Sequence, residues 1–147
     1  MAITQAIANS FKKQLLDGDH DFTAAPSGDI FKIALYTSSA TLNSSTTAFT
    51  SSNEVPNSGQ YTSGGGALVN LATSITAGVA RVDFADRSFT GVTITARGAL
   101  IYNTSSAVTN ASVCVLDFGG DKTATSGVFT IQFPAQTSTA AILRISG

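Results

Sequence analysis

Apolar and polar positions alternate along much of the chain, and this alternation predicts β-strands. Near the C-terminus, Phe129, Ile131 and Phe133 recur at a period of two, which places their side chains on one face of a strand. The run 113–116 is apolar without a break, so we expect a central strand that is covered on both faces. The segment 117–127 between them is rich in Gly, Asp and Thr and is predicted to be an exposed hairpin loop.

Segments with the pattern of strands also occupy the middle of the chain. In the first of them, Phe31, Ile33 and Leu35 face one way and the residues between them face the other. A turn at 76–78 predicts a hairpin. About eight strands are expected in all, at residues 29–38, 67–75, 78–84, 89–95, 97–102, 113–116, 128–133 and 140–145. This pattern predicts an all-β fold, an antiparallel β-sandwich or jelly-roll-like barrel, in a single domain over residues 1–147.

A helical period occurs only at the N-terminus. Four apolar residues recur there at intervals of four and would form one stripe on a helix: Ile3, Ile7, Phe11 and Leu15. Thr4 is a candidate N-cap and Gly18 stands where a helix would end, so one short amphipathic helix is predicted over about residues 5–16, within 1–18. Its stripe must be buried across the open end of its own sheet or on a neighbouring subunit, and the sequence leaves both open.

A long segment without a clear period spans residues 39–66. It is rich in Ser, Thr, Asn and Gly and contains three scattered large apolar residues, Phe49, Val55 and Tyr61. Loops of this length are usually functional, flexible or ordered by a partner. We therefore predict that these three residues and the helix stripe contact a partner, with a surface loop that has no partner as the equal alternative.

Charged residues make up only 12% of the chain, against about 25% in an average soluble protein, and 43% of the residues are hydrophobic. Such a weakly charged surface suits a protein that is packed against other subunits, although it also fits a secreted domain. The net charge is −1 and the basic residues form no cluster, so nucleic acid is not an expected partner.

The opening residues lack the basic start and unbroken apolar run of a signal peptide. No stretch approaches the roughly 18 apolar residues of a membrane span. We therefore expect a protein that is made in a cytoplasm and has no membrane partner.

Asp17, Asp19 and Asp21 occupy alternate positions, as carboxylates do at the start of a calcium loop. The later positions of that motif fail, because Phe22 stands where the turn glycine belongs and Gly28 where the bidentate Glu belongs. A solvated turn is the favoured interpretation and no metal site is predicted, although the sequence leaves open whether the three carboxylates hold a cation.

No arrangement of residues predicts catalysis. A Ser-His-Asp triad would need His20, the only histidine, and no serine lies within a GxSxG motif. Cys114 lies in an apolar strand and is predicted to be a core residue. The remaining carboxylates show no spacing that would pair them as acid and base: Asp83, Asp86, Asp117 and Asp121. We expect a protein that is not an enzyme and has no cofactor.

Arg97 is the polar residue that stands out among the predicted strands. It could pair with Asp83 or Asp117 on a neighbouring strand and fix the register of the sheet, which is the favoured interpretation. It could also cross a subunit interface, where arginine is enriched. We therefore include Arg97 among the predicted interface residues.

Four segments resemble small structural proteins encoded by tailed bacteriophages: MAITQAIANSFKKQLLDGDHDF, DIFKIALYTSSATL, ITARGALIYN and LDFGGDKTATSGVFTIQFP. The resemblance covers nearly the whole chain and includes no active site. It implies a virion component made in the host cytoplasm, most like a capsid decoration (cement) protein. Such a protein would lie on the capsid surface, bind the major capsid protein and form homo-oligomers, with a trimer as one option. A tail, neck or fibre-base component is the alternative, and a carbohydrate-binding β-sandwich is a third hypothesis.

Overall fold

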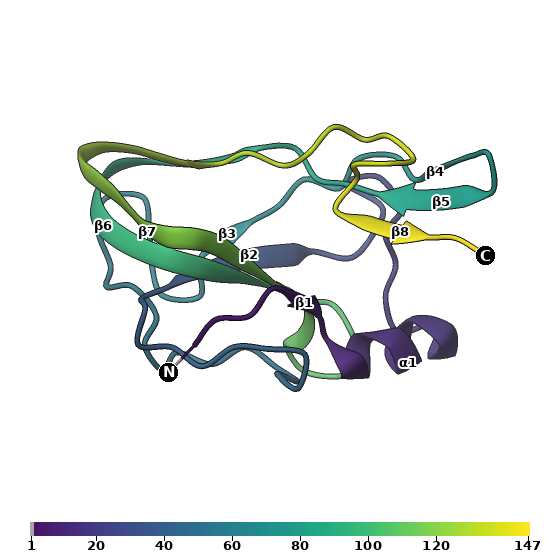
Figure 1. The fold of residues 1–147 in the computed structure, drawn as a ribbon, viewed down its shortest axis with the longest axis horizontal. Helices are drawn as coiled ribbons and strands as arrows, with labels where there is room; N and C mark the ends of the chain where they lie inside the picture. Colours follow the sequence, from purple (N-terminus) through teal and green to yellow (C-terminus); the bar gives the residue numbers. More distant parts are fainter. Residues whose placement is uncertain (1) are drawn as a thin grey trace.

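The computed structural model describes residues 2–147, which form two antiparallel β-sheets and one short helix (Figure 1). This confirms the predicted all-β sandwich class. The elements are β1 (Ala6–Ile7), α1 (Asn9–Asp17), β2 (Phe31–Tyr36), β3 (Gly66–Ala67), β4 (Ser74–Thr76), β5 (Val79–Val82), β6 (Arg87–Asn103), β7 (Ala111–Ile131) and β8 (Leu143–Ile145). The larger sheet has the order β1-β7-β6-β2-β3, and the smaller sheet has the order β4-β5-β8.

The two longest strands, β6 and β7, pair along most of their length and form one curved ribbon. Figure 1 shows this ribbon turning at one end of the molecule, so that its outer half returns over the larger sheet toward β5 and β8. Phe89, Val92 and Phe129 on the outer half share the main core with Ile101 on the inner half and Ile33 on β2. The sandwich is therefore closed partly by a single ribbon that is folded on itself.

The predicted hairpin loop at 117–127 is wrong, because these residues lie within β7. The glycines that favoured a loop mark irregularities of the strand instead. Between Ala96 paired with Lys122 and Gly98 paired with Asp117, the pairing advances two residues along β6 and five along β7. The extra residues form a bulge that includes Gly119, whose φ of 78° suits glycine. The predicted strands 89–95 and 97–102 likewise belong to one strand, β6.

The larger sheet is buried on both faces. Phe31, Ile33 and Leu35 of β2 face the main core, as predicted, while Ala34 and Tyr36 face a second core on the opposite side. Strand β7 lies between β1 and β6, and its run 113–116 contributes Val113 to the main core and Val115 to the second core, which confirms that both of its faces are covered. The second core is covered by the N-terminal segment and the segment 39–66, which contribute Ile3, Ala40, Leu42 and the half-buried Phe49.

The N-terminal helix is shorter than predicted. Ile3 forms a bridge with Leu42, and Ile7 belongs to β1, which pairs with β7, so neither residue is helical. The N-cap is Ala8 and not Thr4, and it makes no side-chain capping bond. Gly18 ends the helix as expected, in the left-handed conformation, with its N–H bonded to Leu15.

The small sheet contains the predicted hairpin between β4 and β5. Its turn residues, Ala77 and Gly78, both have positive φ, of 50° and 77°. All three of its strands are shorter than the sequence pattern suggested. This sheet lies across the molecule from α1, and the space between them is the site described next (Figure 1).

Candidate functional site

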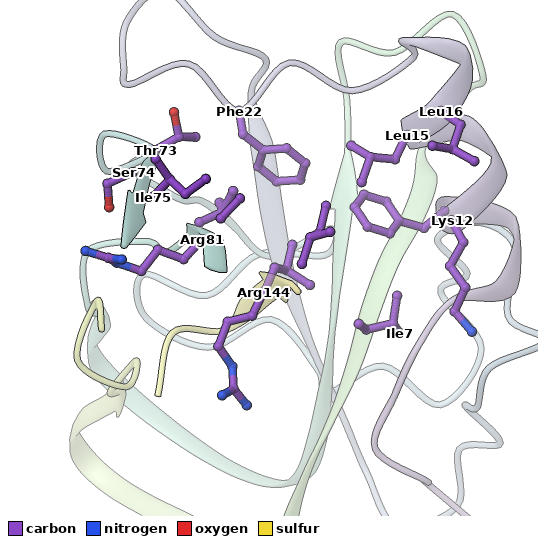
Figure 2. A pocket seen from close by; sticks show the side chains of 15 residues that line it. Ile7, Lys12, Leu15, Leu16, Phe22, Thr73, Ser74, Ile75, Arg81 and Arg144 are labelled. Carbon is purple, nitrogen blue, oxygen red and sulfur yellow. The ribbon is translucent and has the colours of Figure 1, made fainter. Parts of the chain in front are cut away.

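An open groove of about 630 Å³ lies between α1 and the small sheet (Figure 2). One wall is formed by the helix and by Ile7, and the other by β4, β5 and β8. Figure 2 shows Leu15 and Ile75 on opposite sides, with Phe22 between them at one end. Most side chains that line it are apolar, and we call it the α1 groove.

The sheet wall is apolar because one face of a twisted sheet collects alternate residues. Ile75 pairs with Ala80, which pairs with Ile145, so these three side chains share a face. Val82 and Leu143, two residues along, lie on the same face and pack into the main core. Beyond the core, the same face of the sheet is open to solvent. Ile75 is 71% exposed there and Ile145 is 60% exposed.

The helix wall changes from buried to exposed along its length. Phe11 is buried and packs edge-on against Phe22, with ring centroids 5.9 Å apart. Leu15 is half-buried at the border of the main core, and Leu16 is 89% exposed. Three predicted interface residues, Ile7, Phe11 and Leu15, therefore line the α1 groove.

The charged residues that line the α1 groove are all cationic: Lys12, Arg81 and Arg144. Lys12 and Arg144 extend toward the end of the groove at which Ile7 lies (Figure 2). Arg81 is held by its Nε, which donates to the carbonyl of Gln136 at 3.1 Å. Within residues 2–147, none of the three forms an ion pair, and no carboxylate lines the groove. Arg81 and Arg144 lie on the opposite face of the small sheet from Ile75 and Ile145, and Figure 2 shows Arg81 directed away from the groove. The cationic ends near the rim are thus those of Lys12 and Arg144.

A polar network fixes α1 to the rest of the protein. His20 lies on the ring of Phe11, and its Nε2 is 3.0 Å from Oε1 of Gln14 on the helix. Nδ2 of Asn103, at the end of β6, donates to Nδ1 of His20 at 2.9 Å and to Asp29 at 2.7 Å. These partners assign the neutral ring with its proton on Nε2.

Burial lowers the pKa of His20 below its usual value, against the opposing effect of Asp29 and Asp19. The orientation of the Asn103 amide is also fixed, because its Oδ1 accepts hydrogen bonds from the N–H groups of Ser105 and Ser106. A protonated His20 would therefore turn an N–H toward the NH₂ group of Asn103. The geometry and the pKa both favour a neutral ring.

The predicted loop residues are divided between the two cores. Val55 and Tyr61 are buried in the main core, and Phe49 stacks on Tyr102 with ring centroids 4.8 Å apart. Ile3 is buried in the second core. In this structure, the burial of Ile3, Val55 and Tyr61 leaves them no free surface for a partner, and the contact predicted for them stays a prediction.

Tyrosine hydroxyls hold the segment 39–66 in place. The hydroxyl of Tyr61 accepts from the N–H of Leu35 at 2.8 Å and donates to Glu54 at 2.7 Å. Glu54 also accepts from the hydroxyl of Ser63 and the N–H of Gly64. Burial raises the pKa of Tyr61 well above its usual range, so its proton remains available to Glu54.

The other two tyrosines anchor the same segment. Tyr36 donates to the carbonyl of Thr50 at 2.6 Å, and Tyr102 donates to the carbonyl of Gly64 at 2.6 Å. Burial raises the pKa of Tyr102 to about 12. Every tyrosine of the chain thus bonds to this segment, which is ordered by its own sheet.

The candidate polar residues have local partners. Arg97 pairs with Asp117, with Nε 3.4 Å from Oδ1, which confirms the favoured intrachain contact. The pKa of Asp117 is lowered mainly by the N–H of Gly119. Asp83, the other possible partner, is buried and accepts from the N–H of Phe84. Cys114 is buried as predicted, and burial raises its pKa to about 12.

Two of the three aspartates of the calcium-like segment, Asp17 and Asp21, are also engaged. Asp17 pairs with Lys13, and Asp21 accepts two hydrogen bonds from Thr23. Within residues 2–147, no three His, Cys, Asp or Glu side chains gather in a way that could hold a metal ion. The same residues include no helix of the length and apolarity that a membrane crossing requires.

The α1 groove contains residues that sequence reasoning missed. Ile75, Ile145, Leu16 and the cations Arg81 and Arg144 were not predicted as a site. The apolar residues of the predicted strands 67–75 and 78–84 do not by themselves report whether another layer covers them. Comparisons with protein-family models, curated proteins and solved structures each gave no match.

Proposed function

We propose that this chain is a non-enzymatic structural protein of a tailed-bacteriophage virion. In this role it decorates the capsid and stabilises the shell by binding the major capsid protein and further copies of itself. The lattice would repeat each contact many times, so contacts of modest strength would suffice.

The observation that carries the proposal is the exposed apolar surface of the α1 groove. Leu16, Ile75 and Ile145 are all more exposed than buried, and contiguous apolar surface of this kind is typical of interaction sites. The low charge of the chain and the resemblance of its four segments to phage structural proteins support the same role.

Copy number per particle tests the proposal. Quantitative mass spectrometry of purified particles would compare this chain with the major capsid protein, and a lattice-wide ratio is expected for a decoration protein. A handful of copies would favour the tail, neck or fibre base instead. Absence from particles would overturn the virion role and leave the carbohydrate-binding hypothesis to be tested on glycan arrays.

A further inference from the structure

The α1 groove is an apolar surface that the chain itself leaves open. Its walls carry Ile75 on the sheet and Leu16 on the helix, with exposed fractions of 71% and 89%. Covering such side chains is favourable by about 25 cal/mol for each Å² of apolar area removed from water. An occupant that covers both walls would therefore gain binding free energy from the apolar area that it removes from water.

The exposure of the walls favours a polypeptide segment over a small amphiphile. Ligand pockets for small molecules enclose most of the ligand surface, whereas Leu16, Ile75 and Ile145 project outward from the rim here. A helix or strand with apolar side chains toward both walls would cover all three. A single lipid chain lying between Phe11 and Val82 would leave them in water.

The charges of the rim select among polypeptide partners. Lys12 and Arg144 carry their charges toward the Ile7 end of the groove, which no carboxylate lines, and they form no ion pair within residues 2–147. Two copies of this chain that met groove to groove about a twofold axis would bring these cations together, which is unfavourable. A partner that carries Asp or Glu beside its apolar residues would be attracted.

We propose that the α1 groove binds an acidic amphipathic segment of a partner protein. The apolar side chains of the segment enter between Ile75 and Leu15, and its carboxylates lie against Lys12 and Arg144. The inference rests on the proposed function only for the identity of that partner, which would be the coat protein. The recognition chemistry stands on the groove alone.

Selection from a displayed library of random peptides on the purified chain tests this chemistry. The enriched peptides are expected to combine Leu, Ile, Phe or Val with Asp or Glu. One enriched peptide, labelled with fluorescein, is then titrated by anisotropy against Ile75→Asp, with Ile30→Asp as the matched control, because Ile30 is exposed outside the groove.

Ile75→Asp is expected to weaken binding by about tenfold or more, and Ile30→Asp to leave it unchanged. Lys12→Glu and Arg144→Glu should each weaken binding of the acidic peptide, and wild-type affinity should fall as salt is raised. Enrichment of neutral or basic peptides would overturn the proposal. So would binding that Ile75→Asp leaves intact.

Two further measurements identify other occupants. A wild-type dimer that dissociates in Ile75→Asp, seen by light scattering, would show that a second copy fills the groove. A lipid retained in native mass spectrometry of the wild type and lost in Ile75→Asp would show a small amphiphile. Either result would overturn the proposal.

Purified particles separate this inference from the proposed function. If Ile75→Asp associates with particles as the wild type does, the groove is not the contact with the coat, so the partner assigned to the groove is wrong while the virion role stands. If the wild type binds acidic peptides through the groove but is absent from particles, the recognition chemistry stands and the virion role fails.

Discussion

The segment 39–66 and the α1 groove both contain large apolar residues, yet the fold treats them in opposite ways. Val55 and Tyr61 of the segment are buried by the chain itself, and the tyrosine hydroxyls bond to its backbone and to Glu54. In the groove, Leu16 and Ile75 remain exposed. Apolar content alone therefore does not identify a binding surface, and what distinguishes one is apolar residues that the chain does not cover.

The largest loss of stability is expected from a substitution at Phe11, where the groove meets the main core. Phe11→Ala should destabilise the protein by about 3–5 kcal/mol, because this buried ring packs on His20 and Phe22. Leu16→Ala, on the exposed end of the helix, should change stability by no more than about 0.5 kcal/mol. Denaturant unfolding at two protein concentrations measures both.

The dependence of unfolding on protein concentration shows whether α1 is held by its own chain or by a neighbouring subunit. Because Phe11 is buried within its own chain, the loss from Phe11→Ala should be the same at both concentrations. A loss that appears only on dilution, as dissociation with the domain still folded, would show that the helix is held by a neighbouring subunit.

A smaller loss is expected where the segment 39–66 is held. Tyr61→Phe should cost about 1–3 kcal/mol, because it leaves the buried N–H of Leu35 without its acceptor and removes a donor to Glu54. Tyr36→Phe is the matched control. It removes one bond to the carbonyl of Thr50 and should cost about 0.5–1.5 kcal/mol. Equal losses of stability in the two variants would contradict the larger contribution expected from the two hydrogen bonds of Tyr61.

Some of this fold was predictable from periodicity and some was not. The alternation of β2 was read correctly, because a strand buried on both faces keeps strict alternation between its two cores. The helix start was wrong since a spacing of four residues, as between Ile3 and Ile7, fits one face of a helix and also one face of a strand. The hairpin at 117–127 was wrong since glycines such as Gly119 serve in bulges as well as in turns.

The site was less predictable than the fold. Burial of Tyr61 depends on Leu35, 26 residues away in the sequence, and no local pattern reports that contact. The exposure of Ile75 and Ile145 is equally non-local, because short strands of the small sheet have the same apolar content whether or not another layer covers them. Only the stripe predicted for the N-terminal segment led to the groove from sequence, through Ile7 of β1 and Phe11 and Leu15 of α1.

Acid should destabilise α1, which His20 contacts, at a higher pH than it destabilises the segment 39–66. The pKa of His20 is lowered by burial, so below pH about 6.5 the unfolded chain binds a proton that the folded ring does not. Stability therefore falls as the pH drops through that value. Burial raises the pKa of Tyr61, so its hydrogen bonds are unaffected in this range.

Hydrogen exchange of α1 at pH 7.5 and 5.5, corrected for the intrinsic rate, measures this difference. Amides of α1 should lose protection at the lower pH more than those at 53–64. His20→Phe should destabilise the protein and flatten the pH dependence of unfolding between these values. An unchanged slope in this variant would assign the effect to other groups.

The smallest effect is expected at the Arg97 and Asp117 pair, which belongs to neither region. Its side chains are 38% and 28% exposed, and the 3.4 Å contact is screened by water, so Arg97→Gln should barely move the unfolding midpoint. The same variant addresses the interface predicted for this residue. If Arg97 also crosses between subunits, sedimentation velocity would show a smaller species for Arg97→Gln while the midpoint stays constant. If its partner is Asp117 alone, neither quantity should change, and Asp117→Asn should behave in the same way.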